Sequence, residues 1–142
     1  MLGEADLVVP MPLPLLQTEI AILGISMKVI ESMLNIKGIK GVVLETYGAG
    51  NAPNNEEFIK LISKAIGKGI YIVNVTQCVG GSVLLGHYET SSQLKEIGVI
   101  NAKDMTTESA IAKMMYLLGI GIKKDEFVLY YEQSLRGEIT NK

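Results

Sequence analysis

The chain has 142 residues, of which 48% are hydrophobic and 20% are charged, a composition typical of one globular domain and not of a disordered segment. The formal net charge is −2, from 13 basic and 15 acidic residues, and no basic stripe of the kind that neutralises nucleic-acid phosphates is present. The single cysteine, Cys78, and the single histidine, His87, exclude an intrachain disulfide and a zinc site built from these two residue types alone. We therefore expect neither a nucleic-acid partner nor such a metal site.

The beginning of the chain, Met1 to Leu16, is apolar and interrupted by proline. Three prolines stand at alternate positions between residues 10 and 14, which favours an extended segment that does not form a strand. The segment lacks the basic flank of a signal peptide and the length of a membrane span. We interpret residues 1–18 as the remnant of an interdomain linker and residues 19–142 as one domain, and we expect no membrane partner.

Apolar runs and amphipathic segments alternate along the first half of the chain. We predict strands at Glu19–Ile25, Gly41–Thr46 and Ile70–Thr76, with helices at Met27–Leu34 and after Asn55. The helix after Asn55 has the clearest pattern, because its apolar residues recur at the i, i+3, i+4 spacing of one buried face. These residues are Phe58, Leu61, Ile62, Ala65 and Ile66. Asn55 is its expected N-cap, Glu56 and Glu57 suit its first turn, and Gly67 and Gly69 end it.

The second half has weaker patterns. We expect an extended piece at Val83–Leu85, a helix at Ser92–Ile97, a short strand at Val99–Ile100, a helix starting at Thr106 and a last helix at Asp125–Ser134. In the helix that starts at Thr106, the spacing predicts a buried face made of Ile111, Met114, Met115 and Leu118.

Strands that alternate with amphipathic helices indicate a parallel sheet covered on both faces. The predicted fold class is α/β: a three-layer α/β/α domain with a small, mostly parallel, flavodoxin-like sheet of about four strands.

Two segments leave the carboxyl ends of neighbouring predicted strands, where open parallel sheets bind ligands. They are residues 45–53, Glu-Thr-Tyr-Gly-Ala-Gly-Asn-Ala-Pro, and residues 74–81, Asn-Val-Thr-Gln-Cys-Val-Gly-Gly. Small polar side chains and glycine let backbone amides approach a small ligand closely. Neither segment carries a charged acid–base pair, so these loops suit binding better than catalysis.

Other interpretations of these segments fit less well. A dinucleotide-binding loop would need a third glycine where Pro53 stands, and no Gly-Lys-Ser/Thr motif follows Gly48-Ala49-Gly50; a plain glycine-rich turn stays open. Cys78 as a nucleophile would need a base in reach, and we expect it instead to be a buried, inert cysteine.

Five segments, in order along the chain, resemble the C-terminal domain of type I (cytoplasmic) L-asparaginases. They are Leu44–Pro53, Val73–Cys78, Gly98–Ile100, Asp104–Thr106 with Glu108 and Ala110, and Leu135–Glu138. The resemblance implies hydrolysis of L-asparagine to L-aspartate and ammonia in the cytoplasm, without a metal or organic cofactor. It places the nucleophilic threonine in an N-terminal domain. Because the family's Thr-Gly-Gly-Thr and Thr-Asp-Thr motifs are absent from this sequence, the resemblance assigns no catalytic residue to this chain.

The resemblance also implies particular ligand contacts and partners. In this family the C-terminal domain completes the active site of a partner subunit, so we expect a homo-oligomer and a missing N-terminal domain. Asn51 matches a residue that reaches toward ligand across that interface, and Asn51, Thr76 and Cys78 match an effector site for L-asparagine. Glu45 stands where some bacterial members have an arginine. A glutamate would repel the effector's carboxylate, so it weighs against control by asparagine; a carboxylate with hydrogen-bond partners of its own is the other interpretation.

The end of the chain contains Arg136, the only arginine. It is expected to pair with a carboxylate and to fix the C-terminal tail. For the whole chain, the leading hypothesis is an amidohydrolase domain that is inactive alone. The alternatives are a non-catalytic effector-binding or interaction domain and, less in keeping with the sequence, a small enzyme that uses Cys78.

Overall fold

The computed structural model describes residues 15–20, 26–46, 55–78, 81–83 and 89–140. Within them the elements alternate as expected. They are β1 (Leu15–Ile20), α1 (Met27–Leu34), β2 (Ile39–Thr46), α2 (Glu56–Gly67), β3 (Tyr71–Thr76), α3 (Glu89–Glu96), β4 (Ile100–Asn101), α4 (Thr107–Gly119) and α5 (Lys124–Glu132).

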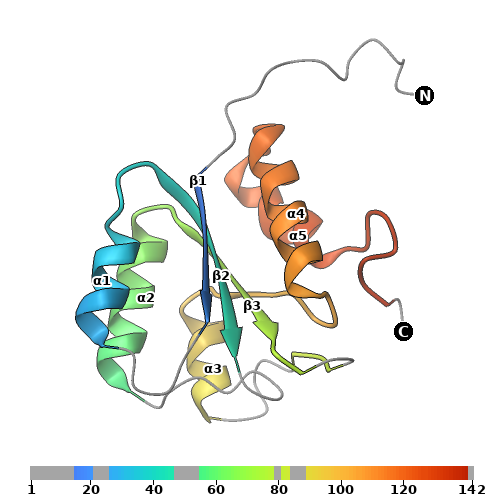
Figure 1. Ribbon diagram of the computed structural model, residues 1–142. Helices are drawn as coiled ribbons and strands as arrows, with labels where there is room; N and C mark the ends of the chain where they lie inside the picture. Colours follow the sequence, from blue (N-terminus) through green and yellow to red (C-terminus); the bar gives the residue numbers. More distant parts are fainter. Residues whose placement is uncertain (1–14, 21–25, 47–54, 79–80, 84–88, 141–142) are drawn as a thin grey trace.

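The sheet has four strands among the described residues, in the order β1-β2-β3-β4, and each neighbouring pair is parallel. When parallel strands follow one another in sequence order, right-handed crossovers place every connecting helix on the same face. Figure 1 shows this arrangement, with α1, α2 and α3 on one side of the strands and α4 and α5 on the other. The predicted three-layer α/β/α fold is confirmed. The strand order does not reverse, so the likeness to flavodoxin lies in the layers and not in the order.

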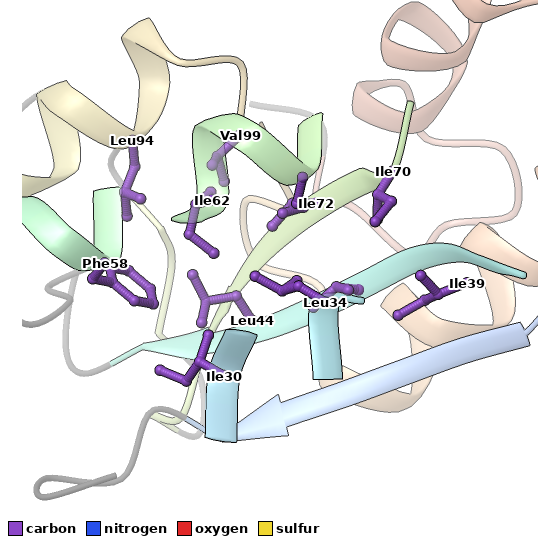
Figure 2. Close-up of a cluster of buried hydrophobic side chains, with 12 residues drawn as sticks. Ile30, Leu34, Ile39, Leu44, Phe58, Ile62, Ile70, Ile72, Leu94 and Val99 are labelled. Atoms are coloured by element: carbon purple, nitrogen blue, oxygen red, sulfur yellow. The ribbon is translucent and has the colours of Figure 1, made fainter. Parts of the chain in front are cut away.

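The face covered by α1, α2 and α3 carries one hydrophobic cluster (Figure 2), in which Leu44 and Ile72 of the sheet meet Phe58 and Ile62 of α2. The helix α2 begins as predicted, because the side chain of Asn55 accepts a hydrogen bond of 2.8 Å from the backbone N–H of Glu57. That bond satisfies one of the N–H groups that a helix start leaves without a partner. Hydrophobic spacing and cap together therefore fix this layer.

The opposite face carries a second cluster, in which Val43, Val73 and Val75 meet α4 and α5. The rings of Phe127 in α5 and Tyr71 in β3 stack with their centroids 3.8 Å apart. Alternate residues along β2 and β3 thus serve opposite layers, as the two-residue period of a strand requires.

The buried face of α4 differs from the prediction. Its buried residues are Ala110, Lys113, Met114 and Leu117, so among the predicted residues Ile111, Met114, Met115 and Leu118 only Met114 is fully buried. The face is turned by one residue because Lys113 takes a buried position. A lysine was not counted toward an apolar stripe, yet its ammonium group finds polar partners described below.

Strand β1 also differs from the prediction. It begins at Leu15 and not at Glu19, so Leu15 and Leu16 belong to the sheet and not to a strand-incompetent linker. The last proline is Pro14 before this strand, and from Leu15 onward every backbone N–H of β1 can donate to a ladder. Residues 21–25 lie outside the described residues, and the limits of the linker stay a prediction.

Other boundaries move by a few residues. The predicted helices at Ser92–Ile97 and Asp125–Ser134 are α3 and α5, and the predicted strand at Val99–Ile100 is β4. Val83 is buried but not in a strand, and residues 84 and 85 lie outside the described part. No described helix has the length and apolar character needed to cross a membrane.

Candidate ligand-binding site at the carboxyl end of the sheet

The carboxyl ends of β2 and β3 lie level with each other. Thr46, the last residue of β2, is paired in register with Thr76, the last residue of β3, and Glu45 is paired with Val75. The backbone N–H of Gln77 donates to the carbonyl of Thr46 at 3.0 Å, which extends the pairing by one residue. The two segments singled out in the sequence therefore leave the sheet side by side at one edge.

Thr76 shapes the turn that follows β3. Thr76 is 8% exposed, and its Oγ1 accepts a hydrogen bond of 3.1 Å from the backbone N–H of Cys78, which is the geometry of a threonine-stabilised turn. The N–H of Gly81 then donates to the carbonyl of Cys78 at 2.9 Å. Thr76, Cys78 and Gly81 thus form one compact unit at the strand end.

Gly81 is required in this unit by close packing. A Cβ atom at this position would lie 2.9 Å from Cβ of Cys78, 3.0 Å from its carbonyl oxygen and 3.1 Å from Cγ2 of Thr76. All three distances are too short for an unstrained contact, so only glycine lets the chain return onto Thr76.

Two further polar side chains lie beneath this turn. Thr46 and Asn74 are fully buried, and the Thr46 hydroxyl donates to Oδ1 of Asn74 at 2.8 Å. The hydroxyl also lies 3.3 Å from the carbonyl of Val75. Nδ2 of Asn74 has no hydrogen-bond partner among the described residues. The sequence pointed to the segments that contain Thr46 and Asn74, but it did not single out either residue.

Glu45 faces the other layer of the domain. Its carboxylate accepts a short hydrogen bond from the hydroxyl of Thr107, the first residue of α4. Since Val43 packs with α4 and α5 while Leu44 packs with α1 and α2, alternation along β2 turns Glu45 toward α4 and away from the side of Thr76. A carboxylate at a helix N-terminus is also favoured by the helix dipole.

The start of α4 is well capped. The Thr106 side chain accepts from the backbone N–H of Ser109 at 3.2 Å, as expected for an N-cap threonine. The pKa of Glu108 is lowered, first by a backbone hydrogen bond and then by the Thr106 hydroxyl. Glu45 and Glu108 thus place negative charge where the helix start offers N–H groups.

The structure brings together some of the predicted site residues but not all of them. Thr76 and Cys78 form one turn, whereas Glu45 lies at the same edge of the sheet on the opposite face. Asn51 lies outside the described residues. Thr107, which the sequence did not indicate, lies far from Glu45 along the chain, and no local pattern could have shown their contact. The direction of Glu45 could have been inferred from alternation along β2.

The chemistry available in the described part of the chain is that of binding. Cys78 is exposed, so the prediction of a buried cysteine is wrong: the turn carries this side chain outward past the last residue of β3. The only histidine, His87, lies outside the described residues. Among the described residues no group of three or more His, Cys, Asp or Glu side chains could hold a metal ion. Hydroxyl, amide and backbone groups remain, and these suit a small polar ligand.

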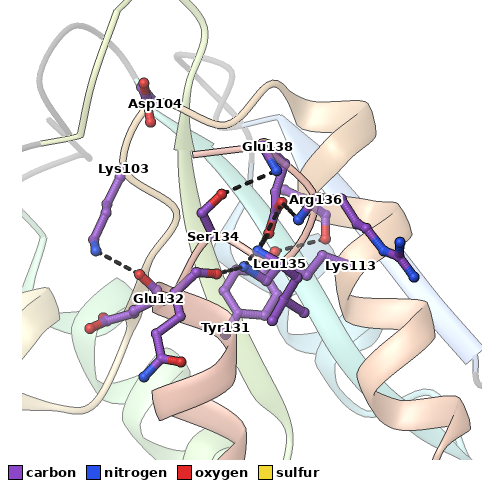
Figure 3. Close-up of polar contacts among 12 residues, drawn as sticks. Lys103, Asp104, Lys113, Tyr131, Glu132, Ser134, Leu135, Arg136 and Glu138 are labelled. Atoms are coloured by element: carbon purple, nitrogen blue, oxygen red, sulfur yellow. Dashed lines mark hydrogen bonds and ion pairs between the residues drawn. The ribbon is translucent and has the colours of Figure 1, made fainter. Parts of the chain in front are cut away.

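The C-terminal segment is fastened by a buried ion pair that the sequence did not indicate (Figure 3). Nζ of Lys113 lies 2.6 Å from Oε1 of Glu138, and the two side chains are 4% and 13% exposed. Lys113 also donates to the carbonyl of Gln133. Burial would raise the pKa of Glu138, but hydrogen bonds from Lys113 and from the backbone N–H groups of Leu135 and Arg136 outweigh it and lower this pKa to about 2.

Arg136 does not form the predicted carboxylate pair with any described residue. Its backbone N–H donates to Oε2 of Glu138 at 2.7 Å, while its side chain is exposed. Lys113 has the anchoring role expected of Arg136, because it reaches Glu138 from inside the domain. The buried Tyr131 donates to the carbonyl of Ala110 at 2.7 Å, and burial together with the charge of Glu138 raises its pKa, so its hydroxyl stays neutral.

Comparison with known proteins places this geometry in a family. Residues 20–130 match the Glutaminase/Asparaginase C-terminal domain. L-asparaginase 1 of Escherichia coli K12 is 37% identical over 142 residues, covering 97% of this chain and 41% of that protein. The crystal structure of L-asparaginase I from Vibrio cholerae is similar with a TM-score of 0.83 at 38% identity, covering 92% of this chain and 39% of that chain.

The same domain occurs in proteins of another name. A glutamyl-tRNA(Gln) amidotransferase of Pyrococcus abyssi has a component that is 36% identical over 117 residues, covering 82% of this chain and 26% of that protein. The chain spans about two fifths of the length of the asparaginases it matches, with 41% and 39% covered. It belongs to the Glutaminase/Asparaginase C-terminal domain family.

Proposed function

We propose that this chain acts as the C-terminal domain of an L-asparaginase, which hydrolyses L-asparagine to L-aspartate and ammonia. The observation that carries the proposal is the extent of the match: 97% of the chain aligns with L-asparaginase 1 of E. coli, but only 41% of that protein is covered. The described residues offer a turn suited to ligand binding and no activated nucleophile. Such a domain would be inactive by itself and would act with the part of the enzyme that carries the nucleophile.

The proposed ligand is L-asparagine, bound at the carboxyl ends of β2 and β3. Thr76 and Cys78, held in one turn, would form part of its binding surface, together with Asn51, which is assigned by resemblance. We give Glu45 a structural role, because its carboxylate is engaged by Thr107 on the opposite face. A carboxylate there would not meet an effector bound beside Thr76, so the repulsion expected from the sequence loses its geometric basis.

The partners and the location follow the same resemblance. We propose that an N-terminal asparaginase domain completes the active site, that the assembled enzyme is a homo-oligomer, and that it works in the cytoplasm. A single cysteine is in keeping with a reducing compartment. No cofactor is part of the proposal.

A non-catalytic amino-acid-binding or interaction domain is the second candidate. It is favoured by the similarity to part of an amidotransferase, because a domain that occurs in proteins of two names supports more than one activity. The two candidates differ in whether the domain contributes to turnover once it is joined to the rest of an enzyme.

The proposal is tested first on the chain itself. Ammonia release from L-asparagine should be absent, whereas calorimetric titration with L-asparagine and L-aspartate should give saturable heat. Thr76→Val should abolish that heat, because valine keeps the shape of threonine but removes the oxygen that accepts from Cys78.

The controls separate the alternatives. Cys78→Ala should keep ligand binding, since the turn uses the backbone N–H of Cys78. Ammonia release that survives purification and disappears in Cys78→Ala would replace the proposal with an enzyme that uses Cys78. Absence of saturable heat with both amino acids would remove the binding surface assigned to Thr76.

A further inference from the structure

The amide of Asn74 is the one described buried side-chain group with an unused polar atom. Asn74 is 0% exposed in β3, between β2 and β4. Its Oδ1 accepts from Thr46 at 2.8 Å, but Nδ2 has no hydrogen-bond partner in the described part of the structure. Rotating the amide by half a turn would let Nδ2 donate to Thr46 and would leave Oδ1 without that donor. One polar atom of this amide is unused in either orientation.

An unused buried N–H group destabilises the fold, because it has lost its hydrogen bonds to water and gained none. An apolar side chain of similar size, such as leucine, would avoid this loss. Thr46 would keep an acceptor in that case, since its hydroxyl also lies 3.3 Å from the carbonyl of Val75. The hydrogen bond to Thr46 therefore does not by itself account for an amide at position 74.

The position of Asn74 connects it with the candidate site. Asn74 and Thr76 lie on the same face of β3, two residues apart, which corresponds to about 7 Å along a strand. Thr46, which fixes the amide, is the register partner of Thr76. The unused N–H group thus lies directly behind the turn in which Thr76 and Cys78 are held.

We propose that Asn74 is a further ligand-recognition residue of this site, whose N–H2 group donates to an oxygen of the bound amino acid while Thr46 holds the amide in place. This inference rests on the proposed function, because it takes its ligand from there. Binding would satisfy a donor that is unsatisfied in the ligand-free protein, so the same amide that weakens the free fold would strengthen the complex. The ligand group it recognises is a carboxylate or carboxamide oxygen.

The test compares ligand affinity in Asn74→Asp and in the wild-type chain, by calorimetric titration with L-aspartate and L-asparagine at pH 8 and at pH 5. Aspartate has the shape of asparagine and still accepts from Thr46, but when ionised it has no donor. We expect affinity to fall about tenfold or more at pH 8, the loss that corresponds to one hydrogen bond of about 1.4 kcal/mol. At pH 5 a buried carboxyl group is protonated and offers an O–H donor, so affinity should recover in the variant only.

Asn101→Asp is the matched control. Asn101 is the register partner of Asn74 in β4, and both polar atoms of its amide are used, by the carbonyl of Val83 at 3.2 Å and the N–H of Lys103 at 2.7 Å. This variant should lose stability without the pH-dependent change in affinity. Circular dichroism of each variant checks that the comparison is made between folded proteins.

Asn74→Leu provides a readout that needs no ligand. If Nδ2 is unsatisfied in the free protein, this variant should unfold at the same or a higher urea concentration than the wild-type chain, and it should bind amino acids weakly. A markedly lower urea midpoint would overturn the inference, as would wild-type affinity in Asn74→Asp at both pH values. If the wild-type chain binds neither amino acid, both the ligand site and this inference fail; if it binds and Asn74→Asp has no effect, the inference alone fails.

Discussion

Glu45 and Thr76 lie at the ends of neighbouring strands and have different surroundings. Glu45 is bound by the Thr107 hydroxyl at the start of α4, whereas Thr76 is bound by the backbone N–H of Cys78. A carboxylate held at a helix start stabilises the junction between sheet and helix, while a hydroxyl held in a turn sets the shape of a surface. The first is a structural contact and the second belongs to the candidate site.

Substitution of Glu45 should therefore affect folding more than ligand binding. Glu45→Ala removes the hydrogen bond with Thr107, and we expect the free energy of unfolding to fall by about 1 kcal/mol. The affinity for L-asparagine should stay within about twofold of the wild-type value, an effect of less than about 0.5 kcal/mol. Urea denaturation and calorimetric titration measure the two quantities. A gain in affinity of about tenfold or more would restore the role of Glu45 as a repelling charge.

Gly81 is the second position at which a single atom matters. Gly81→Ala places a Cβ within 3.1 Å of Thr76 and closer to Cys78, so we expect a loss of stability of about 1–3 kcal/mol, as for other overpacked positions, together with weaker ligand binding. Gly67→Ala is the control, because a Cβ at the end of α2 meets no heavy atom within 4 Å. Equal urea midpoints for the two variants would contradict the packing of the turn.

At the level of elements, the C-terminal segment depends on α4 through the pair of Lys113 and Glu138. Both side chains are largely buried, so removal of one partner leaves the other without its main counter-charge. Glu138→Gln should lower the free energy of unfolding by about 3 kcal/mol at pH 7. Lys60→Met is the control, because Lys60 and Glu56 form a solvent-exposed pair at 3.5 Å, and such pairs contribute little.

The same pair predicts how stability depends on pH. The pKa of Glu138 is about 2 in the fold against an ordinary value of 4.5. A lowered pKa means that the stabilisation is fully present above pH 4.5 and is lost as pH falls toward 2. The difference in urea midpoint between the wild-type chain and Glu138→Gln should be constant from pH 7 to about 5 and should shrink below it. A difference that grows on acidification would contradict this sign.

Most elements could be predicted from the sequence because their signals are local. The cap and apolar spacing of α2 specify it without reference to the rest of the chain. The start of β1 was placed too late, because Gln17, Thr18 and Glu19 interrupt the apolar run that marks a buried strand. The face of α4 was misplaced because Lys113 is buried only through Glu138, which is distant in the sequence.

The candidate site could be predicted in outline and not in its contacts. Glycine and small polar residues after two apolar strands indicated the carboxyl edge of the sheet, and the register of Thr46 with Thr76 confirms that edge. The contacts of Glu45 with Thr107 and of Lys113 with Glu138 each join distant parts of the chain. No local pattern encodes such pairs, because they depend on how the layers pack.

At the scale of the whole molecule, the sheet order has a consequence for function. With α1, α2 and α3 on one face and α4 and α5 on the other (Figure 1), the strand order does not reverse, so the sheet lacks the crevice in which doubly wound folds enclose a ligand. The carboxyl edge therefore presents a surface and not a closed cavity. We infer that a second body must cover the ligand, in keeping with a chain that spans 41% of L-asparaginase 1 of E. coli.

The central claim is that this chain supplies the ligand-binding surface of an asparaginase whose remaining part supplies the chemistry. The most direct measurement is ammonia release from L-asparagine by a chimera in which this chain replaces the matching part of L-asparaginase 1 of E. coli. We expect the chimera to release ammonia and the chain alone to release none. A chimera that folds and assembles like the E. coli enzyme but releases no ammonia would contradict the claim.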